Sequence, residues 1–150
     1  MRRKDRERDA VFAWEVFDRS AFGVLSLRDG EGGYGVPISP ARIGDTVYFH
    51  CAQEGKKLAC IAQWPHASLT VCEAAGPDYF GCKYRSAILS GEVSRVTDES
   101  EKTQALRAIS EKYCPEDMAD FDAYLAPRLK ATAVYRMDVA EITGKERMPK

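Results

Sequence analysis

Hydrophobic and polar positions alternate along much of this chain, a pattern typical of β-strands with one buried face. Such segments span residues 20–28, 34–39, 46–52, 66–73, 83–96 and 131–143. Between them, apolar residues recur at helical spacing in residues 10–19, 55–64, 97–114 and 117–125. Several consecutive strands are joined by short turns, which implies antiparallel pairing. The pattern therefore predicts an α+β, mainly β fold: a small closed or split β-barrel of about six strands with flanking helices.

Local signals refine these elements. Prolines 37 and 40 predict an edge strand, because proline cannot donate to a β-ladder. Gly91 predicts a β-bulge, and the glycine and proline in residues 74–78 predict a loop. Thr97 or Asp98 is expected to cap the helix that follows. In the first helix the predicted buried positions are Val11, Trp14 and Phe17.

Composition restricts the class of protein. The 150 residues fit one domain spanning 1–150, and a net charge of −1 gives no global attraction to nucleic acid or anionic membranes. The charged segment 2–9 mixes both signs, so we expect a solvated arm or one packed on a partner subunit. Five cysteines without C-x-x-C spacing and two histidines indicate free thiols in a reducing cytoplasm and no dedicated metal site.

A glycine and two lysines follow the third predicted strand, at Gly55-Lys56-Lys57. The lysines fall in the first turn of a predicted helix, where the backbone dipole is partly positive and cations cost stability unless an anion offsets them. Free amide hydrogens, a glycine that allows close approach and two ammonium groups would suit a phosphate. Solvated lysines on an amphipathic helix are the alternative that the spacing leaves open.

Three other features could take part in catalysis or ligand binding, but each also has a purely structural explanation. His50 ends the strand before Gly55 and is either a general acid or base or a hydrogen-bonded structural residue. Residues 36–40 would expose backbone groups able to meet the edge of a flat heterocycle, or would form an ordinary edge strand. Ser86 would bond a polar ligand or another backbone group. Rossmann and P-loop nucleotide sites are disfavoured, because no GxxxxGK[ST] sequence occurs and the glycines of residues 30–35 lie in a predicted hairpin turn and do not open a helix.

The run from Tyr48 to Lys57 reads Y-F-H-C-A-x-x-G-K-K. It resembles the H-x-A-x-x-G-K-K motif of the FMN-binding split-barrel proteins related to pyridoxamine 5′-phosphate oxidase. Within that group the chain most resembles the 5-nitroimidazole-resistance branch, also in residues 1–7, 83–88 and 134–145. The similarity spans nearly the whole chain and implies a split-barrel homodimer with FMN at the subunit interface. One departure is Val-Pro-Ile-Ser-Pro at 36–40, where the family often has a segment like Val-Pro-Met-Asn-Phe.

The resemblance also implies a set of site residues. Lys56 and Lys57 would hold the FMN phosphate, and Ser86 would bond the cofactor. His50 would lie near the flavin ring or a small substrate and is the candidate catalytic residue. The remaining predicted cofactor-binding residues belong to the edge strand or to the motif itself: Val36, Pro37, Ile38, Ser39, Phe49, Cys51, Ala52 and Gly55.

The activity implied by the resemblance is flavin-dependent oxidoreduction. NADH or NADPH would reduce FMN, and the flavin would reduce a small organic acceptor, with nitroaromatics among the candidates. The alternative is a non-enzymatic module that stores or senses a flavin, haem or another anionic ligand on the same dimeric barrel. A dimeric interaction protein with an empty cleft is a third hypothesis.

Overall fold

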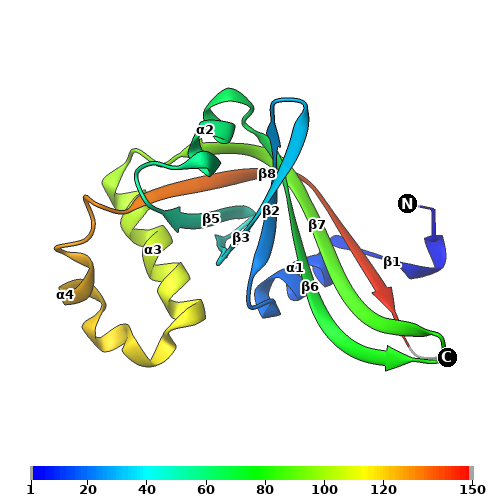
Figure 1. The fold of residues 1–150 in the computed structure, drawn as a ribbon. Coiled ribbons are helices and arrows are strands. Elements are labelled where there is room, and N and C mark those ends of the chain that lie inside the picture. Colours follow the sequence, from blue (N-terminus) through cyan, green and yellow to red (C-terminus); the bar gives the residue numbers. More distant parts are fainter. Residues whose placement is uncertain (1, 149–150) are drawn as a thin grey trace.

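Eight strands form one antiparallel sheet in the computed structural model, which describes residues 2–148 apart from the side chains of residues 74 and 75 (Figure 1). The order within the sheet is β3-β2-β6-β7-β8-β5-β4, with β1 paired to β8 beside this path. Over the described residues the path runs from β3 to β4 without returning, so the sheet is open, as in a split barrel. The predicted fold class is confirmed. The strands are β1 (Glu7–Arg8), β2 (Gly23–Asp29), β3 (Gly32–Ile38), β4 (Ala41–Ile43), β5 (Thr46–Cys51), β6 (His66–Asp78), β7 (Gly81–Arg95) and β8 (Ala133–Arg147).

Helices α3 and α4 lie beside β5 at one end of the sheet, whereas α1 lies against its central strands (Figure 1). Helix α1 packs across β6, β7 and β8, α2 packs on β2, and α3 packs on β4 and β5. The connection from α3 to β8 continues through a 3-10 helix and α4, where the sequence predicted one short helix. The bounds are α1 (Ala10–Arg19), α2 (Lys56–Gln63), α3 (Glu99–Tyr113) and α4 (Phe121–Leu125), with 3-10 helices η1 (Lys4–Arg6) and η2 (Pro115–Asp120).

Helix α1 buries part of the predicted stripe, because Phe17 is buried and Trp14 packs against the core, but Val11 does not. Ala13, Val16 and Phe17 face the sheet, whereas the side chain of Val11 is 78% exposed. Val11 precedes Ala13 by two residues, which at 100° per residue is about 200° around the helix. The prediction for Val11 was therefore wrong.

Proline and glycine act in the sheet mostly as the sequence indicated. Strand β3, which contains Pro37, is an edge strand paired only to β2 on the main path. Gly91 lies opposite a bulge, although the extra residue, Ala140, belongs to β8. The predicted loop at 74–78 is wrong, because β6 continues to Asp78, with Pro77 paired to Cys82 and Gly76 within a register shift between residues 74 and 77.

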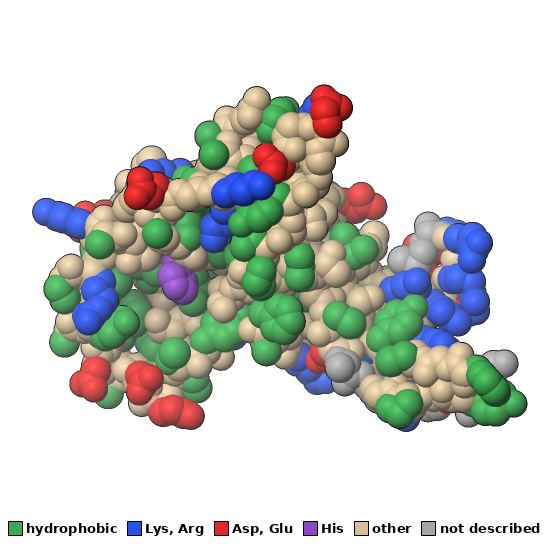
Figure 2. Space-filling model, in the orientation of Figure 1, with side chains coloured by type: hydrophobic (Ala, Val, Ile, Leu, Met, Phe, Trp, Pro, Cys, Tyr) green, Lys and Arg blue, Asp and Glu red, His purple; other side chains and the backbone are tan. Residues whose placement is uncertain are grey.

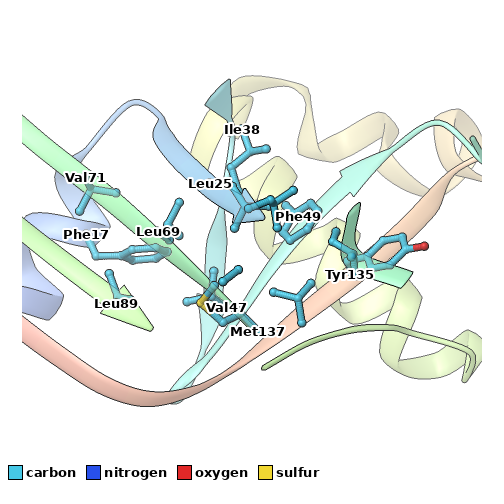
Figure 3. Packing of buried hydrophobic residues seen from close by; sticks show 14 of the residues in the cluster. Phe17, Leu25, Ile38, Val47, Phe49, Leu69, Val71, Leu89, Tyr135 and Met137 are labelled. Carbon is cyan, nitrogen blue, oxygen red and sulfur yellow. The ribbon is translucent and has the colours of Figure 1, made fainter. Parts of the chain in front are cut away.

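The main core fills the concave side of the sheet (Figure 3). Phe17 of α1 packs there with residues of β6 and β7, and Phe49 of β5 stacks on Tyr135 of β8 with ring centres 5.8 Å apart. Tyr48 and Val134 point the other way and join a second cluster beneath α3 and α4. Both faces of this corner of the sheet are thus covered, and not the single face that an alternating pattern indicates.

The N-terminal arm pairs with its own chain. Glu7 and Arg8 form β1 opposite Lys145 and Gly144 of β8. The guanidinium of Arg8 donates to Glu146 at 3.0 Å. This arm was expected to be solvated or packed on a partner subunit, and the structure shows instead that part of it extends the sheet.

Among the residues described, no helix combines the length and the hydrophobicity needed to cross a membrane.

Candidate functional site

The candidate site is built around the turn between β5 and α2. Strand β5 ends at Cys51 and α2 begins at Lys56, with Gly55 as the N-cap residue. The φ angle of Gly55 is 136°, in the region that favours glycine. The N-cap supplies no side-chain hydrogen bond to the helix, so the first amides of α2 face outward without a side-chain acceptor from this position. This turn provides positive electrostatic potential and N–H donors at one point.

A pocket of about 250 Å³ opens beside this turn. Its walls come from the end of β3, the end of β5, the first turn of α2 and the residue before β2. Five of the predicted site residues are therefore brought together from three separate elements. The lining residues are Phe22, Pro37, Ile38, Ser39, His50 and Lys57.

Phe22 is the wall that sequence reasoning missed. Phe22 is 58% exposed. It lies in the short connection between α1 and β2 and lines the pocket opposite the end of β3. A large apolar side chain directly after a helix end was the available signal, but it was interpreted as part of the strand.

The two lysines of the motif are not equivalent. The ammonium group of Lys56 forms an ion pair with Asp29 at 2.6 Å, which raises the pKa of Lys56 through a hydrogen bond and charge. Lys57 is half-buried and lines the pocket. Its Nζ atom lies 5.3 Å from the centre of the Phe49 ring. Lys57 is the cation directed to the pocket, whereas Lys56 already has an acidic partner.

His50 is neutral near pH 7. Protein atoms packed around the imidazole lower its pKa below the ordinary 6.5, and the positive charge of Lys57 lowers the pKa further. A neutral imidazole offers one N–H donor and one acceptor nitrogen. Next to it, burial raises the pKa of the Cys51 thiol, with Lys57 acting in the opposite direction. The site therefore presents a cation, a neutral imidazole and a protonated thiol.

Several predicted residues lie near the pocket without lining it. Val36 is half-buried against the main core, and Phe49 is fully inside that core. Ala52 and Gly55 belong to the exposed turn. These residues shape the backbone around the pocket, and their side chains do not form its walls.

Ser86 is far from the other predicted residues. It pairs with Lys145 on β8, whereas His50 pairs with Val134 on the same strand. The two β8 positions are eleven residues apart, which is about 36 Å along a strand at about 3.3 Å per residue. Within one chain, Ser86 and His50 cannot bind the same part of a ligand.

A second set of residues holds the end of the pocket's β3 wall. The carbonyl oxygen of Pro40 accepts a hydrogen bond from Tyr113 Oη at 2.9 Å and another from Lys112 Nζ at 3.0 Å. Lys112 also donates to the carbonyl of Phe17 at 3.0 Å. Burial lowers the pKa of Lys112 to about 8 and raises that of Tyr113 to about 12. The helix α3 thus fixes the segment that contains Ile38 and Ser39, a role without a sequence signal because it depends on long-range contacts.

A family model described as pyridoxamine 5′-phosphate oxidase matches residues 9–146 of the chain. The chain belongs to this family. The match confirms the predicted family and extends over all helices and nearly every strand of the sheet. No curated protein matches the chain in sequence.

Solved structures similar to this member of the pyridoxamine 5′-phosphate oxidase family cover nearly all of it. A candidate 5-nitroimidazole antibiotic resistance protein from Bacteroides thetaiotaomicron is 22% identical, with a TM-score of 0.82, and the match covers 93% of this chain and 84% of that one. The flavocytochrome of Azotobacter vinelandii is 25% identical, with a TM-score of 0.84 and coverage of 99% and 73%. A FAD-binding protein of Mesorhizobium loti is 20% identical, with a TM-score of 0.72 and coverage of 95% and 98%. These likenesses support the split-barrel fold.

Proposed function

We propose that this protein is a flavin-dependent oxidoreductase that binds FMN and reduces a small organic acceptor with electrons from NADH or NADPH. The observation that carries the proposal is the pocket where Lys57 and His50 meet the proline-containing end of β3, beside the helix start at Gly55. The family match adds support, because the similar structures include a FAD-binding protein and a flavocytochrome.

The residues at the helix start fit a phosphate group. Gly55 has no heavy atom within 4 Å of the position that a Cβ would occupy, so a ligand has room to approach the backbone. The first N–H groups of α2 and the ammonium of Lys57 are donors that an anion would satisfy. In this proposal Lys57 holds the phosphate directly, and Lys56 contributes after exchanging Asp29 for the ligand.

The other end of the pocket fits a flat polar ring. Residues 37–39 lie on an edge strand, so their outward backbone groups are available for hydrogen bonds. A bound flavin supplies the hydride and electron chemistry. The protein residues orient the ring against β3, and the neutral His50 donates or accepts a hydrogen bond at the ring or at a substrate.

The size of the pocket favours a flavin shared by two chains. Its volume of about 250 Å³ is below the roughly 300–1,000 Å³ of pockets that enclose drug-sized ligands. We therefore propose a homodimer with the flavin at the interface, where Ser86 of the second copy would complete the site. Apolar side chains on the outer sheet support this arrangement: Val24 and Ile88, which share a row through Thr70, are exposed by 37% and 49%.

The free thiols of the chain support a location in the cytoplasm. All five cysteines are free in the structure, which supports the proposal that the protein works in a reducing cytoplasm.

An absorbance spectrum followed by a turnover assay tests the proposed activity. The protein, as purified or after incubation with FMN, should show flavin absorbance and oxidise NADH or NADPH when nitrobenzene is added. His50→Ala should change turnover and leave FMN bound, since His50 contacts the ring side of the pocket and not the helix start. A colourless protein that quenches no FMN fluorescence on titration would refute the proposal.

The likeness to the flavocytochrome favours one alternative, a module that binds flavin or haem without turnover. Tight flavin binding with no donor oxidation, or a Soret band on haem addition, would support this alternative over the enzyme.

A further inference from the structure

We propose that a second hollow, between α3, η2 and α4, binds a neutral single-ring aromatic molecule and is the acceptor site of this protein. Its use as an acceptor site rests on the proposed function, but its ability to bind such a molecule does not.

The hollow adjoins the candidate flavin pocket. Its volume is about 330 Å³, and it shares Ser39 and His50 with that pocket. A molecule in the hollow would therefore lie on one side of the His50 imidazole and a flavin ring on the other. Figure 2 shows a histidine on this face, bordering a hollow with hydrophobic side chains around it.

The walls favour an aromatic ring. Six apolar or aromatic side chains from α3 and α4 line the hollow: Leu106, Ile109, Tyr113, Phe121, Tyr124 and Leu125. The side chain of Tyr124 is 64% exposed. The guanidinium of Arg128 lies 4.0 Å from the centre of its ring, which orients the ring at the mouth of the hollow. A volume near the lower end of the range for ligand pockets suits one ring and not a dinucleotide.

The charges around the hollow favour a neutral occupant. Asp117 and Asp120 line the adjoining depression, which shares Phe121 and Tyr124 with this hollow. Arg128 lines the hollow itself and disfavours a cation, and an anion would have to lose its hydration water against the apolar walls with two carboxylates nearby. Hydroxyl groups of Ser39, Ser110 and Thr132 also line the hollow and provide hydrogen-bonding groups for a polar substituent such as a nitro or carbonyl group.

The direct test uses nitrobenzene as the probe and the flavin-free protein, followed by NMR of the Leu and Ile methyl groups. Nitrobenzene should shift the methyl resonances of Leu106, Ile109 and Leu125 in a saturable way. The anion 4-nitrobenzoate should bind about tenfold more weakly or worse, because of the neighbouring carboxylates. Shifts confined to other methyl groups, or no saturable shift, would overturn the proposal.

Two variants locate the site. Ser110→Phe places a ring inside the hollow and should weaken nitrobenzene binding about tenfold or more, whereas Glu111→Phe places the same ring on the exposed face of α3 and should not. Tyr124→Ala removes an exposed ring, should keep the fold, and should weaken binding about threefold to tenfold. Unchanged affinity in folded Ser110→Phe, or in Tyr124→Ala if Ser110→Phe does not fold, would overturn the proposal.

Parallel FMN titrations separate this inference from the proposed function. If nitrobenzene binds the hollow but FMN does not bind the protein, the proposed function fails and the aromatic site stands. If FMN binds and NADH oxidation proceeds, and Ser110→Phe leaves the KM for nitrobenzene unchanged, the acceptor site is wrong and the proposed function stands.

Discussion

Replacing Lys57 should weaken FMN binding much more than replacing Lys56. Lys57→Gln keeps most of the aliphatic stem and removes the charge that lines the pocket. A hydrogen bond between charged groups contributes about 1.5–3 kcal/mol, so the Kd for FMN should rise roughly 10- to 150-fold. Folding should change less, because the cation–π contact of the half-buried Lys57 with Phe49 contributes about 0.5–2 kcal/mol.

Lys56→Gln is the matched control in the same helical turn. Lys56 must leave Asp29, 2.6 Å away, before it can contact a phosphate, and solvent screens this exposed ion pair so that it contributes little. Its loss should therefore raise the Kd about fivefold or less. Asp29→Asn frees Lys56 and should lower the Kd by a similar factor.

Quenching of FMN fluorescence gives the Kd of each variant, and thermal unfolding without flavin reports on stability. Raising the salt concentration should narrow the difference between wild type and Lys57→Gln, because salt screens the charge. The reasoning is refuted if Lys56→Gln weakens binding more than Lys57→Gln. It is also refuted if flavin affinity holds in both variants while the melting temperature falls, since the lysines would then be ordinary surface residues.

Three further predictions concern stability. Gly91→Ala should lower the free energy of unfolding by about 3 kcal/mol or more, because its Cβ would lie 2.0 Å from the carbonyl oxygen of Asp138; an unchanged urea midpoint would contradict this. Arg85→Met should cost about 2–4 kcal/mol in the same assay, because three glutamates lose a shared cation; a loss under about 0.5 kcal/mol would show that the network is incidental. Lys112 has a pKa of about 8 in the folded protein, whereas its ordinary value, which applies to the unfolded chain, is 10.5. Between these two pH values the unfolded chain therefore binds more protons than the folded protein. The stability of wild type relative to Lys112→Met should thus rise from pH 8 to 10.5, and a constant difference would contradict the lowered pKa.

The sequence predicted features of the fold that depend on local chemistry. Pro37 correctly predicted that β3 is an edge strand, because proline lacks the N–H group that a central strand would donate to a neighbour. Asp98 accepts a hydrogen bond from the amide of Glu101 and so begins α3 as expected for an N-cap. Gly55 is the N-cap of α2 and has a backbone conformation that few other residues adopt.

Features that depend on distant partners were missed. Gly76 and Pro77 looked like a loop, but pairing with β7 continues across them through a bulge. The hydrogen bonds from Lys112 and Tyr113 to the Pro40 carbonyl join residues more than 70 positions apart, and no local pattern marks such a contact. For the site, the structure brings His50 and Lys57 of the motif to one pocket, and Ser86 lies on a remote stretch of β7, where its contact with a cofactor stays a prediction.

The position of β8 in the sheet determines how late the sheet can be completed during folding. In the described sheet β8 alone joins the β3-β2-β6-β7 portion to the β5-β4 portion, and it is the last strand to emerge during synthesis. Until it emerges, β5 with His50 has only β4 as a sheet neighbour, and the edges of β5 and β7 that β8 will cover remain open to other chains. Assembly of the candidate site is therefore a late event in folding, and a chain stalled before residue 133 should be prone to aggregation.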